Sequence, residues 1–328
     1  MEFISAKGLG ELVGQKSGLT SGIQITSGLG YGVGAYLMWG AFPLYFQLLD
    51  SVPSLVVVAN RVMWALVLIV VIVALGRQWS NVRAQFTLRK LAWSFLAGMI
   101  LVGNWSVYVF AVMNDHVVDA SLGYFINPLV TVVLAVLVLN ETLSKPQWFS
   151  IGLAVIGVTT IAISLGTLPW IGIALALTFA SYGLIRKIIG MGSLEGLMLE
   201  TASVFPIAIA YIFVSGEFSK TIDLGWGTVA LLALAGPVTV FPLLAFASAA
   251  NRLPLSVVGM LQYITPTIIF ILGVTLYKEN MLPGEWLGFI AIWIALAIFS
   301  INVLRNQRRP FNRKSADSEA INSGSNLV

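Results

Sequence analysis

Ten apolar stretches, each long enough to cross a membrane, constrain this chain more than any other feature. They cover residues 28–49, 53–75, 91–113, 117–139, 145–164, 168–188, 194–214, 226–250, 255–277 and 283–304. About 20 helical residues span the ~30 Å hydrocarbon core of a bilayer. An open sheet edge in lipid would leave backbone groups unpaired, and the stretches do not alternate as barrel strands do. The sequence therefore predicts an all-α integral membrane protein with ten transmembrane helices.

Composition and proline placement agree with this prediction. Only 10% of the 328 residues are charged, whereas soluble domains are about 25% charged. A proline in the first turn of a helix costs little, because its missing N–H has no acceptor there. Five prolines lie at or just before the start of a stretch: Pro53, Pro146, Pro169, Pro254 and Pro283.

The basic residues give the orientation. Nearly all lie in connections on the side of the N-terminus, whereas the opposite connections hold only Lys220 and Lys278. The positive-inside rule then places both termini in the cytoplasm. Residues 1–27 are predicted to form a flexible tail, and residues 305–328 a basic and polar one.

Nucleic acid and metal partners are not expected. The net charge of +4 is spread over short connections, not gathered on a folded face as nucleic-acid binding requires. The chain has no cysteine and one histidine, His116, so a metal cluster built on these ligands is excluded. No cofactor is expected, and the oligomeric state is not readable.

The chain contains an internal repeat. GYFINPLVTVVLAVLVLNETLSKPQW, residues 123–148, overlays LQYITPTIIFILGVTLYKENMLPGEW, residues 261–286, at a constant offset of 138. Each half, residues 28–164 and 168–304, has five spans. Because five is odd, the second half enters the membrane from the opposite side. Inverted repeats of transporters place the substrate site near the midplane between the halves.

Proline recurs in the repeat, at Pro128 and Pro266. A proline inside a helix frees the carbonyl four residues earlier and kinks the helix. In a membrane this is tolerated where the helix faces protein or a watery cavity. The polar neighbours Asn127 and Thr265 favour helix breaks beside a cavity, although a packing role for either proline is the alternative.

Arg61 is the strongest candidate for substrate binding. It lies inside the second span, where a charge is expensive and normally faces the interior of the bundle. Asn60 and Trp64 share nearly the same side of this helix. We hypothesise that Arg61 binds an anionic group of the substrate. The alternative is a structural arginine satisfied by Asp119 or by backbone carbonyls.

Glu200 is the counterpart of Arg61 in the second half, at offset 139. Burial penalises its charged form, so Glu200 is the candidate for proton coupling. A structural hydrogen bond near the cytoplasmic surface is the alternative.

Further polar and aromatic residues are expected to line the cavity, because ligand pockets combine such side chains. In the third, fourth and ninth spans two such residues share one face of the helix. The first and sixth spans are expected to add aromatic side chains to the cavity wall. The predicted lining residues are Asn104, Tyr108, Tyr124, Asn127, Gln262, Thr265, Trp39, Tyr36 and Tyr182. Glu141 and Glu279, just outside span ends, are expected to be structural.

Several motifs in order resemble RarD-like proteins of the EamA group, in the drug/metabolite transporter superfamily. They are DASLGYFINPLV, NRVMW, GNWSVYVFAV, SYGLIRK, LET and RLPLSVVGMLQYITPT. The resemblance covers roughly residues 28–304. It implies a ten-helix carrier of small metabolites or drugs in the bacterial inner membrane, often an exporter, working by alternating access. The connection around Asn114, Asp115 and His116 departs from the family pattern, so the resemblance assigns no role to His116.

A membrane-embedded enzyme acting on lipid-like substrates is the alternative from another class. It would need clustered acid–base groups, and only Asp115, His116 and Asp119 offer them. A channel would need a filter loop or an acidic ring, which the sequence lacks. No GxxxxGK[ST] motif is present to bind ATP, so the favoured prediction is a secondary transporter whose partners are the lipid bilayer and a small molecule.

Overall fold

The computed structural model describes residues 24–49, 51–113, 117–166, 170–216, 223, 225–276 and 282–307. Throughout these residues the chain is helical and contains no strand. Eight helices of the described chain are long and apolar enough to cross a membrane, and a shorter apolar stretch, residues 123–139, lies within α6. The protein is therefore a multi-pass, all-α membrane protein.

The first predicted span is interrupted. A helix covers residues 24–40, a turn follows at Ala41, and then come the short helix α2 (Phe42–Phe46) and the 3₁₀ turn η1 (Gln47–Leu49). Pro43 lies in the first turn of α2, where it fits a new helix start. Residues 24–27, predicted to belong to the tail, are helical, and Ile25 packs against the hydrophobic core. Residues 1–23 lie outside the described chain.

The remaining helices of the first half agree with the predicted spans to within a few residues. They are α3 (Ser54–Leu75), α5 (Leu88–Met113), α6 (Val117–Leu139) and α7 (Lys145–Leu165), with a short connecting helix α4 (Trp79–Ala84). Pro128 lies inside α6, which continues past it without a break. The predicted helix break at Pro128 was therefore wrong, whereas the predicted break near Pro266 in the second half is present.

The second half contains the break. Its helices are α8 (Trp170–Ile189), α9 (Ser193–Val214), α11 (Trp226–Arg252), α12 (Leu255–Leu261), α13 (Ile264–Thr275) and α14 (Pro283–Gln307). α12 and α13 divide the predicted ninth span at Gln262 and Tyr263, just before Pro266. Pro266 has no N–H to donate to the Gln262 carbonyl four residues earlier. That carbonyl instead accepts a hydrogen bond from the Thr265 amide at 3.1 Å.

Helix starts follow the proline prediction. Pro53 and Pro254 immediately precede α3 and α12, Pro146 lies in the first turn of α7, and Pro283 begins α14. Pro169 lies outside the described residues.

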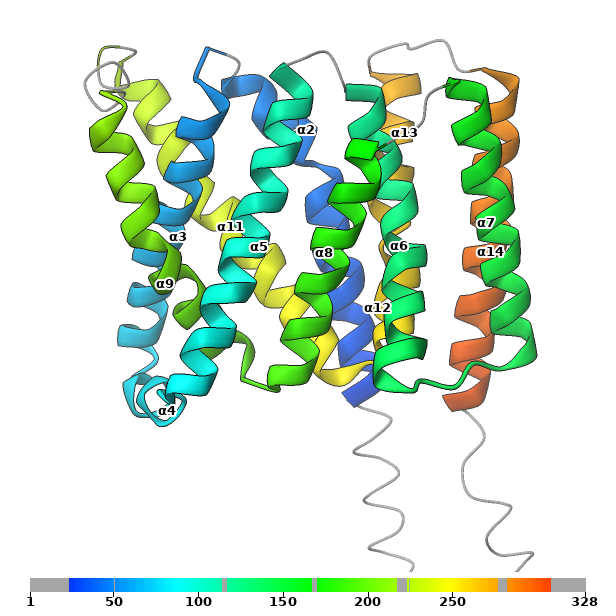
Figure 1. Ribbon diagram of the computed structural model, residues 1–328, viewed down its shortest axis with the longest axis horizontal. Coiled ribbons are helices and arrows are strands. Elements are labelled where there is room, and N and C mark those ends of the chain that lie inside the picture. Colours follow the sequence, from blue (N-terminus) through cyan, green and yellow to red (C-terminus); the bar gives the residue numbers. More distant parts are fainter. Residues whose placement is uncertain are drawn as a thin grey trace, which may run out of the picture.

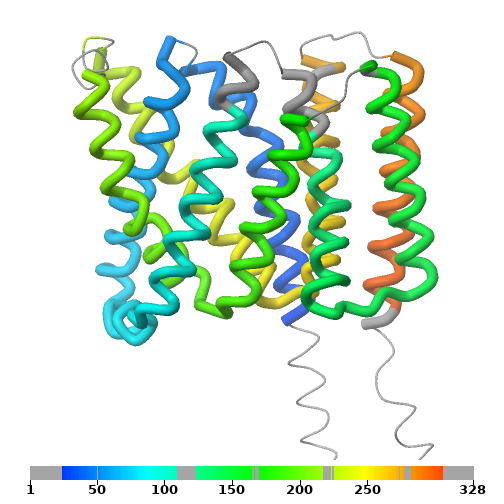
Figure 2. The backbone as a smooth tube through the Cα atoms, viewed as in Figure 1, coloured from blue at the N-terminus to red at the C-terminus, as the bar shows by residue number. Residues whose placement is uncertain are grey.

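The long helices run roughly side by side and alternate in direction (Figure 1). The described part of the chain begins and ends on the same side of the molecule, at the bottom of Figure 2. α3 packs against α9 and α11, α8 packs against α5 and α6, and α6 also packs against α12. α7 and α14 form a pair at one end. This arrangement leaves room for a cavity where α3, α5, α6, α8 and α13 face one another.

Candidate functional site

A cavity lies between helices from both halves of the chain. It has about 1030 Å³ of empty space, including the part that is continuous with solvent. Its lining is Tyr36, Trp39, Phe42, Pro43, Phe46, Arg61, Leu101, Asn104, Trp105, Tyr108, Gly123, Tyr124, Asn127, Leu175, Phe179, Leu243, Gln262, Thr265 and Ile269. The wall is thus mostly aromatic and apolar, with one charge and a few amides and hydroxyls.

Arg61 of α3 supplies the charge. Its side chain is 6% exposed, and its Nε donates to Thr239 Oγ1 of α11 at 3.0 Å. The guanidinium lies 3.9 Å from the centre of the Trp105 ring, and Phe42 and Phe46 lie at 5.5 and 5.7 Å. Rings within ~6 Å of a cation attract it through their π faces. Among the described side chains no carboxylate forms an ion pair with Arg61.

Most of the predicted lining residues do line the cavity. They are Trp39, Tyr36, Arg61, Asn104, Tyr108, Tyr124, Asn127, Gln262 and Thr265. Asn104 donates to the Leu175 carbonyl at 2.9 Å and to Thr178 Oγ1 at 2.8 Å, which fixes its amide against α8. Thr265 donates to the Tyr36 carbonyl at 2.9 Å. These bonds connect α5 with α8, and α13 with the first helix, around the cavity.

Three predicted binding residues lie elsewhere. Asn60 donates to the Val56 carbonyl of its own helix at 3.0 Å. The backbone of Trp64 lies against Gly236 of α11. Positions three or four residues apart share only roughly one side of a helix, and Trp64 points away from the cavity that Arg61 lines. Tyr182 lies one turn beyond the lining residue Phe179 and is fully buried. None of the three borders the cavity.

The two prolines also lie outside the cavity wall, although their neighbours line it. The Pro128 carbonyl lies against Gly259 of α12, where an added Cβ would come within 3.2 Å of it. Pro128 therefore faces a close helix contact, which is the packing alternative. Pro266 marks the α12–α13 break that brings Gln262 and Thr265 to the cavity.

The sequence analysis missed an aromatic part of the wall, formed by Phe42, Phe46, Trp105 and Phe179. Trp105 directly follows the predicted lining residue Asn104. As a tryptophan beside a polar residue in an apolar helix, it was a possible partner for the buried cation of Arg61. Phe42 and Phe46 reach the cavity only because α2 is bent away from the preceding helix, which apolar composition does not reveal.

Aromatic side chains close the other end of the cavity. Phe246 of α11 stacks on Tyr182, with ring centres 5.9 Å apart and planes at 19°. It also lies 5.5 Å from Phe179 and 5.7 Å from Trp39, which are lining residues. Phe246 and Tyr182 are fully buried, so this layer separates the cavity from the side where α8 ends and α9 begins.

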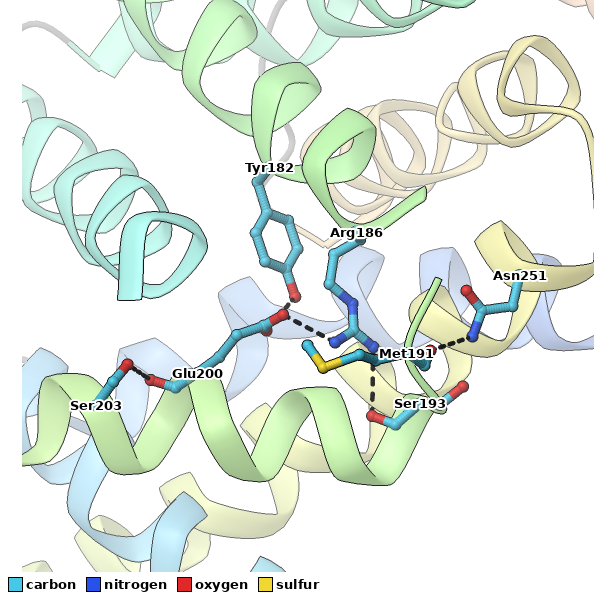
Figure 3. Close-up of polar contacts among 7 residues, drawn as sticks. All are labelled: Tyr182, Arg186, Met191, Ser193, Glu200, Ser203 and Asn251. Atoms are coloured by element: carbon cyan, nitrogen blue, oxygen red, sulfur yellow. Dashed lines mark hydrogen bonds and ion pairs between the residues drawn. The ribbon is translucent and has the colours of Figure 1, made fainter. Parts of the chain in front are cut away.

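Glu200 of α9 does not border the main cavity. It faces Tyr182 and Arg186 of α8 (Figure 3). It pairs with Arg186 of α8 at 2.8 Å. Arg186 was expected in a cytoplasmic connection, and the structure instead buries it in the last turn of α8. A small pocket between the cavity and this pair is bordered by both Thr239, the partner of Arg61, and Glu200.

Glu141 has the structural role that was expected. Its carboxylate accepts from the amides of Leu255 and Ser256 at 2.6 and 3.0 Å and from Ser256 Oγ at 2.6 Å. It therefore caps the start of α12, in the other half of the chain.

Other predictions fall on undescribed parts. Asn114, Asp115, His116, Lys220, Lys278 and Glu279 lie outside the described residues, as does the Asp119 side chain. Among the residues that the structure describes, no three His, Cys, Asp or Glu side chains lie together as metal ligands would.

Comparisons with known proteins identify relatives along most of the chain. Protein RarD of Streptomyces exfoliatus is 42% identical over 298 residues, covering 90% of this chain and 95% of that protein. A Vibrio cholerae protein named as an uncharacterized transporter is 41% identical, covering 83% and 91%. A crystal structure with 18% identity superposes with a TM-score of 0.64 and covers 85% of this chain and 98% of the other, so the fold is shared.

The model of the EamA-like transporter family matches this chain twice, over residues 26–163 and 168–301. The Vibrio cholerae relative is named as a transporter, and the matching family model is one of transporters, so the interpretation as a membrane enzyme is set aside. With both family matches and extensive identity to RarD proteins, this chain belongs to the EamA-like transporter family.

Proposed function

We propose that this protein is a secondary active transporter that exports small metabolites, such as amino acids or related amphipathic compounds and drugs, across the bacterial inner membrane. The observation that carries the proposal is the cavity, which has an amphipathic wall from both halves of the chain and contains the buried cation of Arg61. Both termini lie in the cytoplasm, as the distribution of basic residues favours.

The transporter works by alternating access between two inverted five-helix repeats. The offset of 138 residues and the two family matches support such repeats. Packing supports them too. In the repeat α3 corresponds to α9 and α5 corresponds to α11. α3 packs against α9 and α11, and α9 correspondingly packs against α3 and α5. The helices of the first half run opposite to their counterparts, as α7 and α14 illustrate (Figure 1). Pseudo-symmetric halves allow two arrangements of similar energy around one site.

Arg61 binds the anionic group of the substrate. A central arginine costs on the order of 2.5–3.5 kcal/mol to insert. One hydrogen bond to Thr239 and the ring of Trp105 offset part of this cost. The Nε bond leaves the two terminal nitrogens of the fork as donors that a carboxylate can accept in bidentate fashion. The aromatic rings on the remaining walls then receive the apolar body of the substrate.

Glu200 couples transport to the proton gradient. Its carboxylate can exist either as the ionic partner of Arg186 or in a protonated form that no longer makes this ion pair. The ionisable groups that face it among the described residues are Arg186 and Tyr182. A proton taken up here would therefore change how α8 and α9 are held together.

Counterflow from proteoliposomes tests the transport function. Vesicles containing the purified protein are loaded with unlabelled amino acids, other small metabolites or chloramphenicol-like drugs, and entry of the labelled compound is followed. We expect loading with one class to accelerate entry of the same class, and protein-free vesicles to show no acceleration. If folded protein in sealed vesicles exchanged none of these classes, the proposal would be wrong.

A further inference from the structure

A buried polar network of Tyr182, Arg186 and Glu200 links α8 and α9 (Figure 3). Arg186 Nη1 donates to Glu200 Oε1 at 2.8 Å, and the Tyr182 hydroxyl donates to Glu200 Oε2 at 3.2 Å. Arg186 Nη2 donates to the Ser193 carbonyl at 3.3 Å. The side chains of Arg186 and Glu200 are each 2% exposed. We call Tyr182, Arg186 and Glu200 the inner network.

The order of residues along α8 places this network directly behind the cavity. Leu175 and Phe179 line the cavity, Tyr182 follows one turn later, and Arg186 follows another turn later. Tyr182 belongs to both layers, because its ring stacks on Phe246 and its hydroxyl binds Glu200. A solute moving from the cavity along α8 toward its C-terminal end would meet the ring of Tyr182 and then the Arg186–Glu200 pair.

The ion pair joins two helices that share α5 and α11 as neighbours and differ in their third neighbour. α8 packs against α5 and α6, whereas α9 packs against α3 and α5. Removing one partner of a buried pair leaves an uncompensated charge and is strongly destabilising. The closed arrangement of this end therefore depends on the pair.

Further hydrogen bonds hold the same end of the bundle to α11. Lys187 Nζ donates to the carbonyls of Ala250 and Leu253 at 2.6 and 2.5 Å. Asn251 donates to the Met191 carbonyl at 2.9 Å. These contacts close the α8–α9 junction onto the end of α11, and they do not involve the cavity wall.

The repeat relates the inner network to the cavity. Glu200 and Arg61 are counterparts in the two halves, yet their surroundings differ. Glu200 has a buried cationic partner, whereas Arg61 faces aromatic rings and the open space of the cavity. At equivalent positions of the repeat, the second half thus has a buried ion pair, whereas the first half has a side chain that lines the cavity.

The geometry points to the inner network as the gate that closes the cavity at the α8–α9 end. The ion pair between Arg186 and Glu200 breaks when the cavity opens to that side, and the Tyr182 hydroxyl is released with it. This inference rests on the proposed transport function, because only alternating access requires the closed end to open.

Cysteine labelling tests this gate without needing a substrate. The chain has no native cysteine, and Thr201 borders the small pocket beside Glu200. Thr201→Cys is therefore a unique reporter in the full-length protein. A small membrane-impermeant methanethiosulfonate is added from the α8–α9 side of reconstituted vesicles. We expect slow labelling of Thr201→Cys alone, and labelling roughly tenfold faster when Glu200→Gln is added, a shift of about 1.4 kcal/mol toward the open state.

Two further variants keep the test decisive. Ser203→Ala is the matched control, because Ser203 donates only to the Glu200 main-chain carbonyl, at 2.7 Å, and its loss should leave the labelling rate unchanged. Tyr182→Phe keeps the ring and removes the hydroxyl, and a severalfold increase is expected. If Glu200→Gln does not fold, Tyr182→Phe decides the outcome.

Unchanged labelling in folded variants would overturn the gate. Such a result together with continued counterflow by the parent protein would leave the transport function standing. Faster labelling in the variants without counterflow by the parent protein for any compound class would instead contradict the transport function, because the gate would then open onto a cavity that carries nothing.

Discussion

The guanidinium of Arg61 lies 3.9 Å from the centre of the Trp105 ring, so a cation of α3 is held over an aromatic face of α5. This contact holds the cation at the wall of the cavity, which both residues line.

Replacing Trp105 by leucine should weaken substrate binding more than it slows turnover. The ring contributes about 1 kcal/mol to holding the guanidinium, so we expect the KM for counterflow to rise about fivefold with a smaller change in the maximal rate. Trp64→Leu is the control, because Trp64 lies on the same helix as Arg61 but not on the cavity wall. Equal effects of both variants would argue against a specific role for Trp105.

Arg61→Lys should reduce transport by at least about tenfold at normal membrane abundance. Lysine keeps the charge but loses the planar fork and the stacking surface. Transport rate is measured by counterflow, and abundance by quantitative blotting. Asn60→Ala serves as the neighbouring control, since Asn60 bonds only within its own helix. A parallel loss of abundance and activity in Arg61→Lys would indicate a structural arginine.

Glu200→Gln should make transport less sensitive to pH. Glutamine retains most of the hydrogen-bonding capacity but cannot take up a proton, so the step that depends on protonation disappears. Counterflow and gradient-driven efflux are measured at a series of pH values at which the purified protein stays folded. An unchanged pH profile would exclude Glu200 as the coupling group.

Glu141→Gln should destabilise the protein. The carboxylate accepts three hydrogen bonds at the start of α12, and hydrogen bonds to a charged group contribute about 1.5–3 kcal/mol each. We expect a clear fall in the Tm of the purified protein in detergent. Glu285→Gln is the control, because Glu285 accepts one exposed bond, from the Leu282 amide at 2.7 Å. Similar shifts in Tm for both variants would contradict the cap.

Gly157→Val should separate α7 from α14. A Cβ at Gly157 would come within 2.7 Å of the Gly288 carbonyl and 2.9 Å of the Ile292 side chain, and overpacking costs about 1–3 kcal/mol. Small residues allow such close approach between membrane helices. The control is Gly152→Val on the same helix, where no atom lies within 4 Å of the added Cβ. The Tm should fall only for Gly157→Val.

The sequence by itself determined the helical architecture and much of the cavity wall. Lipid forces backbone groups to bond within each helix, so apolar length alone located the long helices. Polar side chains in apolar helices must face protein or water, and for this reason Asn104, Asn127, Gln262 and Thr265 were correctly expected at the cavity.

Only the tertiary structure decided which aromatic residues join them. Phe42, Phe46 and Phe179 look like any apolar residue in a span, and the bend at Ala41 that brings α2 to the cavity is not encoded in hydropathy. The same holds for Arg186. Its position near the end of a span suggested an exposed cytoplasmic charge, but the structure buries it against Glu200 of α9. Pairing between distant charges depends on how helices pack, and a single chain's apolar pattern does not contain that information.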